Sequence, residues 1–250
     1  MKSVYRLSFI FFFLLFASVN SAVYGQQGDT KEKQKDLLSS LNWKKWSPDP
    51  VPLFTPQESL SQFKLAPGFR IELVAHEPMV KDPVFMDWDD QGRMWVGELR
   101  TYMMDLDGTG EDRRMSRVMV LEDTDQDGVM DQATPFLEDM LNVRSLAFVD
   151  GGVLVVETGG LWFCQDKDGD LRCDERKKLF DFATSAKDNI EHAENALHYA
   201  LDNWMYNSKS SRKLAWRKGK IIEMPAKARG QWGMGSDAYG RLFFNHNGQW

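Results

Sequence analysis

The stretch VFMDWDDQGRMWVGE, residues 84–98, contains two β-rich runs separated by a polar turn with a glycine. Aliphatic, aromatic and β-branched residues on both sides of an Asp/Gly turn are typical of a β-hairpin. The same pattern returns in VRSLAFVDGGVLVVE (143–157), ALHYALDNWMYN (196–207) and WGMGSDAYGRLFFN (232–245). The sequence therefore predicts a repeated β unit rather than a set of unrelated strands.

The second run of each unit recurs at intervals that suit a propeller. These runs begin at Met94, Val153, Trp204 and Leu242, so they start 59, 51 and 38 residues apart. Repeats of about 40–50 residues with four short strands each are typical of propeller blades. We therefore predict an all-β fold: an incomplete β-propeller of four-stranded blades, with about four blades present. The alternative is a β-sandwich with irregular loops.

The uneven spacing is explained by loop insertions, which accumulate where binding sites form. We interpret RTYMMDLDGTGEDRRMS (100–116) as an insertion between blades. The folded body is expected to start near Phe69, where RIELVAHEP (70–78) resembles a strand. We expect the partial propeller to span residues 65–250. An open ring leaves strand edges exposed, so we also expect a fragment or truncated product of a longer protein.

The N-terminal residues predict export. Lys2 and Arg6 precede an apolar run of 11 residues, FIFFFLLFASV (9–19), which is shorter than the roughly 20 residues that span a membrane. We predict a signal peptide over residues 1–25, a periplasmic or secreted location, and no transmembrane helix after cleavage. Residues 26–64 are expected to form a flexible leader and a Pro-rich arm. Within that arm, Thr55 followed by a proline predicts the start of a short helix.

The net charge bears on the choice of partners. The formal charge is −6 at pH 7. Nucleic-acid binding relies on a basic footprint, so we exclude nucleic acid as a partner.

Two acidic loops stand out, DTDQDGVMD (123–131) and DKDGDLRCD (166–174), with Asp at the first, third, fifth and ninth places of each. Alternating carboxylates in a tight loop suit Ca²⁺, which binds six to eight oxygen atoms. Neither loop is an EF-hand, because the twelfth place holds Thr134 in one and Lys177 in the other. The alternative is an Asp-rich turn that needs no metal. The predicted metal ligands are Asp123, Asp125, Asp127, Asp131, Asp166, Asp168, Asp170 and Asp174.

The two loops differ in their glycine. Gly128 occupies the sixth place of the first loop, whereas the second loop has Leu171 there and carries Gly169 two places earlier. Since glycine permits a sharp turn, this difference predicts that the second loop turns differently.

The only two cysteines, Cys164 and Cys173, bracket most of the second loop, since Cys164 stands two residues before it and Cys173 is its eighth residue. In an oxidising compartment they are expected to form a disulfide that staples this loop, the alternative being two unrelated thiols. Neither belongs to a Cys-x-x-Cys-His sequence, so no haem c is attached to this chain.

Four stretches together resemble the N-terminal β-propeller of bacterial putative membrane-bound dehydrogenases, which are fused to cytochrome c domains and related to glucose/sorbosone dehydrogenases. They are LAPGFRIELVAHEPMVKDPVFMDWDDQGRMWVGELRTY, RVMVLEDTDQDGVMDQATPFLEDM, ALHYALDNWMYN and RGQWGMGSDAYGRLFFNHNGQW. The resemblance implies an exported, calcium-binding module of a quinone-dependent sugar or alcohol dehydrogenase-like protein. Its implied cofactor is pyrroloquinoline quinone (PQQ), and its partners are a sugar or polyol substrate and a cytochrome c domain or other electron acceptor. The alternative is a non-enzymatic propeller that binds glycans or partner proteins.

Oxidation of an alcohol by a quinone needs a general base, together with polar and cationic groups that hold the cofactor. We predict His192 as the base, because it precedes a predicted blade. Arg100, Asn195 and Arg229 are the predicted cofactor-binding residues. The alternatives are a loop histidine without a catalytic role and arginines in structural ion pairs.

Overall fold

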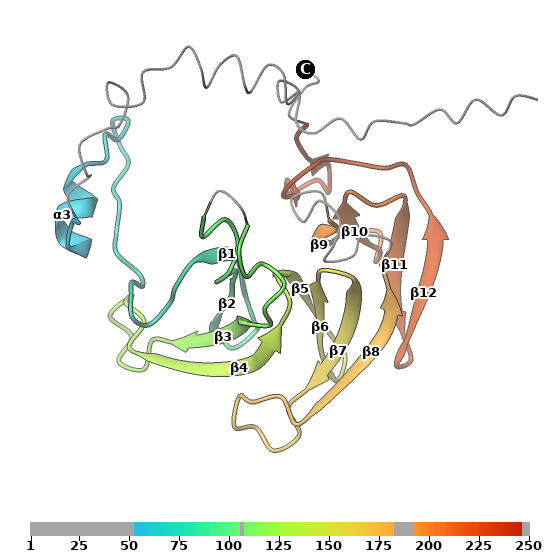
Figure 1. Ribbon diagram of the computed structural model, residues 1–250. Coiled ribbons are helices and arrows are strands. Elements are labelled where there is room, and N and C mark those ends of the chain that lie inside the picture. The colour runs from blue at the N-terminus through green and yellow to red at the C-terminus, as the bar shows by residue number, and fades with distance from the viewer. Residues whose placement is uncertain (1–52, 106–107, 183–192, 247–250) are drawn as a thin grey trace, which may run out of the picture. The chain divides into compact units, whose positions relative to one another are not determined.

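Antiparallel β-sheets carry the fold in the computed structural model, which describes residues 53–105, 108–182 and 193–246 (Figure 1). The first sheet contains β1 (Pro83–Trp88), β2 (Met94–Glu98), β3 (Ser116–Glu122) and β4 (Gln132–Met140). The second contains β5 (Val143–Val149), β6 (Gly152–Glu157), β7 (Gly160–Gln165) and β8 (Glu175–Asp181). The third contains β9 (Asn195–Tyr199), β10 (Met205–Ser208), β11 (Arg212–Arg217) and β12 (Lys220–Pro225). A two-stranded sheet of β13 (Gly235–Ser236) and β14 (Leu242–Phe243) follows.

The sheets are arranged as propeller blades. Within each four-stranded sheet the strands follow one another in chain order. The first strands lie together near the centre, where β5 contacts both β1 and β9, and the fourth strands lie outermost (Figure 1). The four predicted hairpins are present as β1–β2, β5–β6, β9–β10 and β13–β14. The prediction of a partial β-propeller is therefore confirmed.

The antiparallel order gives the sheets two distinct ends. At one end the first strand of each sheet begins and the second strand ends. We call it the polar end. At the other end the loops 123–131 and 166–174 join the third strand of a sheet to its fourth. We call this the acidic end.

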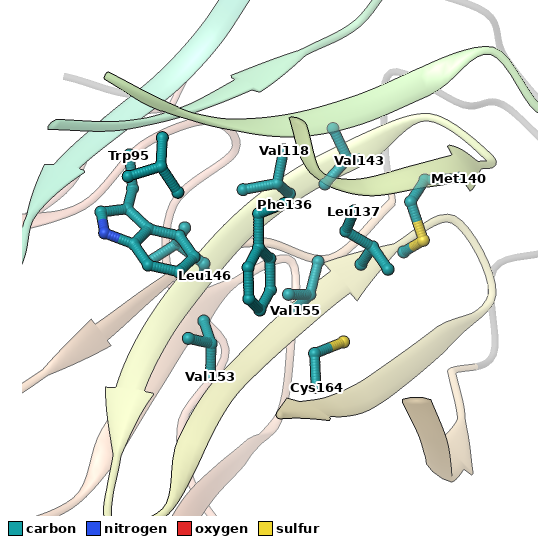
Figure 2. Packing of buried hydrophobic residues seen from close by; sticks show 11 residues of the cluster. Trp95, Val118, Phe136, Leu137, Met140, Val143, Leu146, Val153, Val155 and Cys164 are labelled. Atoms are coloured by element: carbon teal, nitrogen blue, oxygen red, sulfur yellow. The ribbon is translucent and has the colours of Figure 1, made fainter. Parts of the chain in front are cut away.

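Apolar side chains fill the spaces between neighbouring sheets. Between the first and second sheets, Trp95 makes an edge-to-face contact with Phe136 at 4.6 Å between ring centroids (Figure 2). It makes a second edge-to-face contact with Phe148 at 5.4 Å. Between the second and third sheets, Phe163 stacks on Trp216 at 4.8 Å. Because β6 is buried on both faces, its residues are apolar in succession rather than alternately.

The prediction of a strand at 70–78 is wrong. The structure has no strand between Phe69 and Val80, and the segment is linked to the first sheet by a hydrogen bond from the Met130 N–H to the Val74 carbonyl (2.8 Å). Its apolar residues, including Val74 and Met79, instead pack against the face formed by Met94, Val96, Met119, Leu121 and Met130. The apolar residues of this segment therefore serve to pack against the sheet face and do not form a paired strand.

Two smaller predictions have opposite outcomes. The helix predicted after Thr55 is present as α3 (Pro56–Ser61), and Thr55 forms a reciprocal capping box with Glu58. The insertion at 100–116 does not separate two blades, because it joins β2 to β3 within the first sheet. Among the residues that the structure describes, no helix is long and apolar enough to cross a membrane.

Candidate functional site

Buried polar side chains gather at one end of the propeller. Every polar or charged residue that is buried in the described part of the chain lies where first or third strands begin, where second strands end, or in the adjoining loops. These residues are Glu98, Thr101, Ser116, Asn142, Arg144, Ser145, Glu157, Thr158, Glu194, Asn195, Asn207, Ser208 and Ser210. We call this set the polar centre. Since buried polar groups cost free energy unless paired, their confinement to one end marks that end as the candidate site.

Arg144 is the one buried cation of the polar centre and is only 2% exposed. Its Nε donates to Thr158 Oγ1 at 3.1 Å, and its guanidinium lies 5.2 Å from the ring centroid of Trp232. Burial lowers the pKa of Arg144 to about 10, although Tyr102, Glu194 and Glu111 oppose this shift. The side chain therefore remains charged at neutral pH, balanced by nearby carboxylates.

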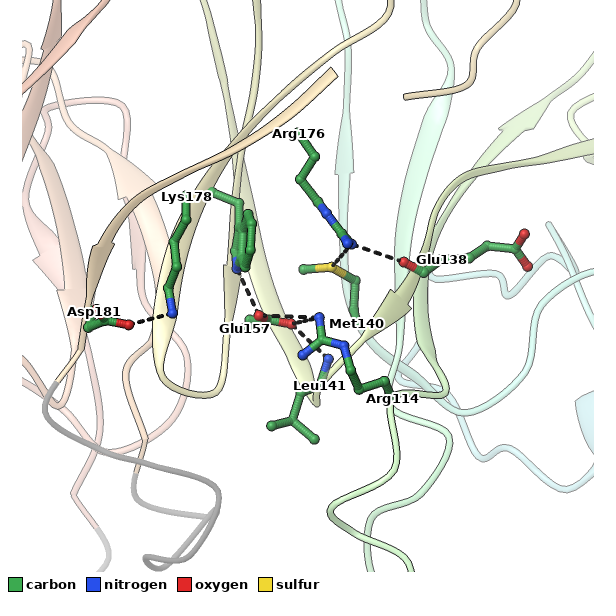
Figure 3. A network of polar contacts seen from close by, with 9 residues as sticks. Arg114, Glu138, Met140, Leu141, Glu157, Arg176, Lys178 and Asp181 are labelled. Atoms are coloured by element: carbon green, nitrogen blue, oxygen red, sulfur yellow. Dashed lines mark hydrogen bonds and ion pairs between the residues drawn. The ribbon is translucent and has the colours of Figure 1, made fainter. Parts of the chain in front are cut away.

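Glu157 ends β6 and ties the first two sheets together. Its carboxylate accepts hydrogen bonds from Arg114 Nη2 (3.1 Å), the Leu141 N–H (2.8 Å) and Trp162 Nε1 (2.8 Å) (Figure 3). Nearby, Arg176 also bridges the sheets by donating to the Glu138 carbonyl (Figure 3). The Glu157 carboxylate is fully engaged, so its role is positional.

Glu98 has the equivalent place at the end of β2. It accepts from the Lys81 N–H at 2.8 Å and from Arg117 Nε at 2.5 Å. Arg100, predicted to bind a cofactor, lies 3.8 Å from the same carboxylate. The structure thus places Arg100 in an ion pair at the rim of the polar centre.

Asn195 and Asn207 differ sharply in their hydrogen bonding. Asn195 donates to the Ala193 and Gln231 carbonyls (3.0 and 2.9 Å) and accepts from the Gly233 N–H (3.0 Å). Asn207, on the neighbouring strand β10, is 2% exposed, yet neither its amide nitrogen nor its amide oxygen has a hydrogen-bond partner. The structure therefore brings the predicted Asn195 into the polar centre, where it is fully hydrogen-bonded, and leaves the buried amide of Asn207 without a partner.

Arg229 is held by local neighbours rather than left available for a cofactor. Arg229 packs 4.5 Å from the ring centroid of Tyr206, and its Nη1 donates to the Lys227 carbonyl at 3.0 Å. His192 lies outside the described residues. The sequence analysis did not identify Arg144 and Asn207, although each is a polar residue within a short β-strand, VRSLAFV and MYNS, which is a signal that the sequence contains.

At the acidic end, each loop gathers three of its four aspartates. One triad is Asp123, Asp125 and Asp131, and the other is Asp166, Asp168 and Asp174. Each residue offers an oxygen, and within a triad these atoms lie within 4.8 Å of one another. Such exposed triads could bind Ca²⁺, which prefers carboxylate oxygens.

The aspartate at the fifth place of each loop stabilises the turn. Asp127 accepts a hydrogen bond from the Val129 N–H (2.8 Å), and Asp170 accepts from the Arg172 N–H (2.9 Å). These side chains stabilise the turn and lie outside the triads.

The prediction that the two loops turn differently is wrong. The first loop has positive φ at Gln126 (65°) and Gly128 (92°), its fourth and sixth places. The second loop has positive φ at the same places, at Gly169 (84°) and Leu171 (64°). The backbone turn is shared, and the glycine occupies a different one of the two left-handed positions.

The two cysteines are free thiols, Cys164 just before the second acidic loop and Cys173 within it. Cys164 is buried in β7, and its thiol is hydrogen-bonded to that of Cys173. This hydrogen bond lowers the pKa of Cys173 to about 7.

The fold and the polar centre define a propeller-type protein with a candidate ligand site at one end of its axis. The chain belongs to the family described as "Domain of unknown function (DUF7133)", which it matches over residues 55–250. No curated protein sequence matches it.

Several solved propellers are similar to this chain at low identity. A gluconolactonase from Xanthomonas campestris is 12% identical with a TM-score of 0.46, over 70% of this chain and 58% of that one. A putative gluconolactonase is 16% identical with a TM-score of 0.44, over 68% and 57%. The PQQ domain of pyranose dehydrogenase from Coprinopsis cinerea is 11% identical with a TM-score of 0.44, over 72% and 46%. This chain spans about half the length of these structures, and the likenesses concern the fold alone.

Proposed function

We propose that this chain is the calcium-binding propeller module of an exported, dehydrogenase-like protein, and that its polar centre binds a sugar or polyol. The proposal depends on the confinement of the buried polar residues to the polar end. Hydroxyl groups both donate and accept hydrogen bonds, so one polyol hydroxyl can serve both unpartnered atoms of Asn207. A neutral ligand also suits a centre where Arg144 is already balanced by carboxylates.

PQQ fits the described residues poorly. It is a planar quinone with several carboxylates and needs several cationic partners. The buried cation Arg144 faces Glu111 and Glu194, while Arg100 and Arg117 pair with Glu98. The acidic triads lie at the opposite end of the sheets, so calcium bound there would be structural and remote from the polar centre. The described residues therefore do not support a catalytic step through this cofactor.

The wider context belongs to the same proposal. The apolar N-terminal stretch supports a periplasmic or secreted location, and the resemblance to dehydrogenase propellers supports a cytochrome c domain or another electron acceptor as partner. A propeller that binds glycans without catalysis would use the same polar centre.

The test is calorimetric titration of the full chain with a panel of sugars and polyols, comparing the wild type with Asn207→Leu. Removing the unsatisfied amide should raise the free energy of unfolding by about 1–3 kcal/mol. It should also weaken sugar binding roughly tenfold or more, because two hydrogen bonds to the ligand are lost. Gln91→Leu, at an exposed amide of the acidic end, is the matched control and should change neither quantity.

A parallel titration with PQQ and an artificial electron acceptor separates the two functions. Sugar binding without electron transfer supports the binding module. Tight quinone binding with sugar-dependent reduction of the acceptor would overturn it in favour of the dehydrogenase. Unchanged sugar affinity in Asn207→Leu would place the ligand outside the polar centre.

A further inference from the structure

The two acidic loops are flanked by residue pairs at equivalent positions. Two residues before the first aspartate stand Leu121 in the first loop and Cys164 in the second. Seven residues after that aspartate stand Met130 and Cys173. Strand register supports the equivalence, because Leu121 pairs with Met94 of β2 and Cys164 pairs with Val153 of β6, near the start of each second strand.

In the first loop this pair forms an apolar contact across the base of the loop. Leu121 and Met130 are both buried and belong to one cluster. In the second loop Cys164 is fully buried in the cluster between the first two sheets, and Cys173 packs against that cluster. The same location therefore holds a leucine and a methionine in one sheet and two cysteines in the next.

The second loop is also attached to the preceding sheet at Cys173. The Cys173 N–H donates to the Phe136 carbonyl of β4 at 2.8 Å, and Leu171 packs against the same cluster as Trp95. Any covalent bond at Cys173 would thus hold the loop against both its own sheet and the neighbouring one.

We propose that Cys164 and Cys173 are a site of oxidative modification, forming an intramolecular disulfide that closes the 166–174 loop at its base. The oxidant is a thiol–disulfide exchange partner. One thiolate of the chain attacks a sulfur of the partner's disulfide and displaces its other sulfur as a thiolate. The second cysteine then attacks the mixed disulfide and releases the partner as a dithiol. The chain loses two protons and two electrons, and the partner is reduced by the same amount.

The bond would act mainly by restricting the unfolded chain, as expected for a short closed loop. It would also hold Leu171, which adopts a left-handed backbone conformation. The first loop needs no such bond, because Leu121 and Met130 supply an apolar contact at that place.

The test uses the full chain incubated with a mixture of oxidised and reduced glutathione. Intact mass should fall by two hydrogens, and iodoacetamide should label neither cysteine after denaturation. Reduction should lower Tm by roughly 5–10 °C, as expected for closing a loop of this length in a chain of this size.

The matched control is the double variant Cys164→Leu/Cys173→Met, which reproduces the pair of the first loop. It should fold, and its Tm should not respond to reductant. Two labelled cysteines in the oxidised wild type, or a disulfide found only between two chains, would overturn the proposal. The single variant Cys173→Ser, at a half-buried position, is a second control. Its Tm should also not change when reductant is added.

Discussion

The two acidic loops share their aspartates and their backbone turn, yet they are held by different neighbours. In the first loop, the eighth residue, Met130, donates its N–H to the segment 69–80. In the second loop, the eighth residue, Cys173, donates to strand β4 of the preceding sheet. The segment 69–80 therefore covers the first sheet at a place where the second sheet is covered by its neighbour. The loop is therefore a local structure, and its anchor is supplied by whichever segment or sheet covers that face.

The loops also distribute strain differently. Each has two left-handed positions and one glycine, so each places one non-glycine residue in a conformation that costs roughly 1–2 kcal/mol. In the first loop this residue is the exposed Gln126, and in the second it is Leu171, which packs against the core cluster. Burial of the leucine side chain offsets the backbone cost only in the second loop.

The largest expected effect tests the anchor of the first loop. Met130→Ala should lower the free energy of unfolding by about 2–5 kcal/mol, because it leaves a cavity under the loop beside Leu121. Chemical denaturation measures this. Val129→Ala, at the neighbouring and 38% exposed position, should stay within about 0.5 kcal/mol of the wild type. Equal effects of the two variants would show that the eighth residue is no anchor.

The next effect tests whether both triads bind calcium. At a hundredfold excess over Kd, each bound ion should stabilise the fold by about 2.7 kcal/mol, and a chelator should remove this gain. Asp125→Asn should abolish the calcium-dependent stabilisation that comes from the first loop. Asp168→Asn should abolish the stabilisation that comes from the second loop. Thermal unfolding with and without Ca²⁺ measures both.

Asp127→Asn and Asp170→Asn are the matched controls for the calcium experiment, since these side chains lie outside the triads. They should retain most of the calcium response. A loss as large as that of the triad variants would mean that four aspartates bind each ion rather than three.

The smallest effect tests the distribution of strain. Gln126→Gly should stabilise the chain by about 1 kcal/mol, because it relieves a left-handed residue whose side chain is exposed. Leu171→Gly relieves the same strain but removes an apolar contact, so it should destabilise by about 1 kcal/mol. Opposite signs in denaturation experiments support the comparison, and a shared sign would contradict it.

Much of the fold was predictable because it depends on sequence patterns among residues close together along the chain. The four hairpins follow from Asp- and Gly-containing turns between β-rich runs, and α3 follows from its capping residues. The segment 70–78 has a strand-like composition as well, but its apolar residues pack on a neighbouring sheet face without pairing. Composition alone does not distinguish a paired strand from a covering segment.

The candidate site was less predictable. Asn195 was identified and lies in the polar centre, whereas Arg144 and Asn207 were missed. Arg100 and Arg229 looked suitable because they lie near strand ends, but each is engaged by a local neighbour. Which polar side chains are buried depends on how three sheets meet, and this is not visible within any one of them.

By itself, the sequence determined the hairpin units, the aspartate spacing and the short capped helix, since each depends on backbone preferences and contacts among residues close along the chain. Only the tertiary structure decided which end of the sheets gathers the buried polar groups, which neighbour anchors each loop, and why Leu171 tolerates a left-handed conformation. These outcomes depend on packing between residues far apart in the chain, such as Cys173 with Phe136, which stabilises arrangements that local preference disfavours.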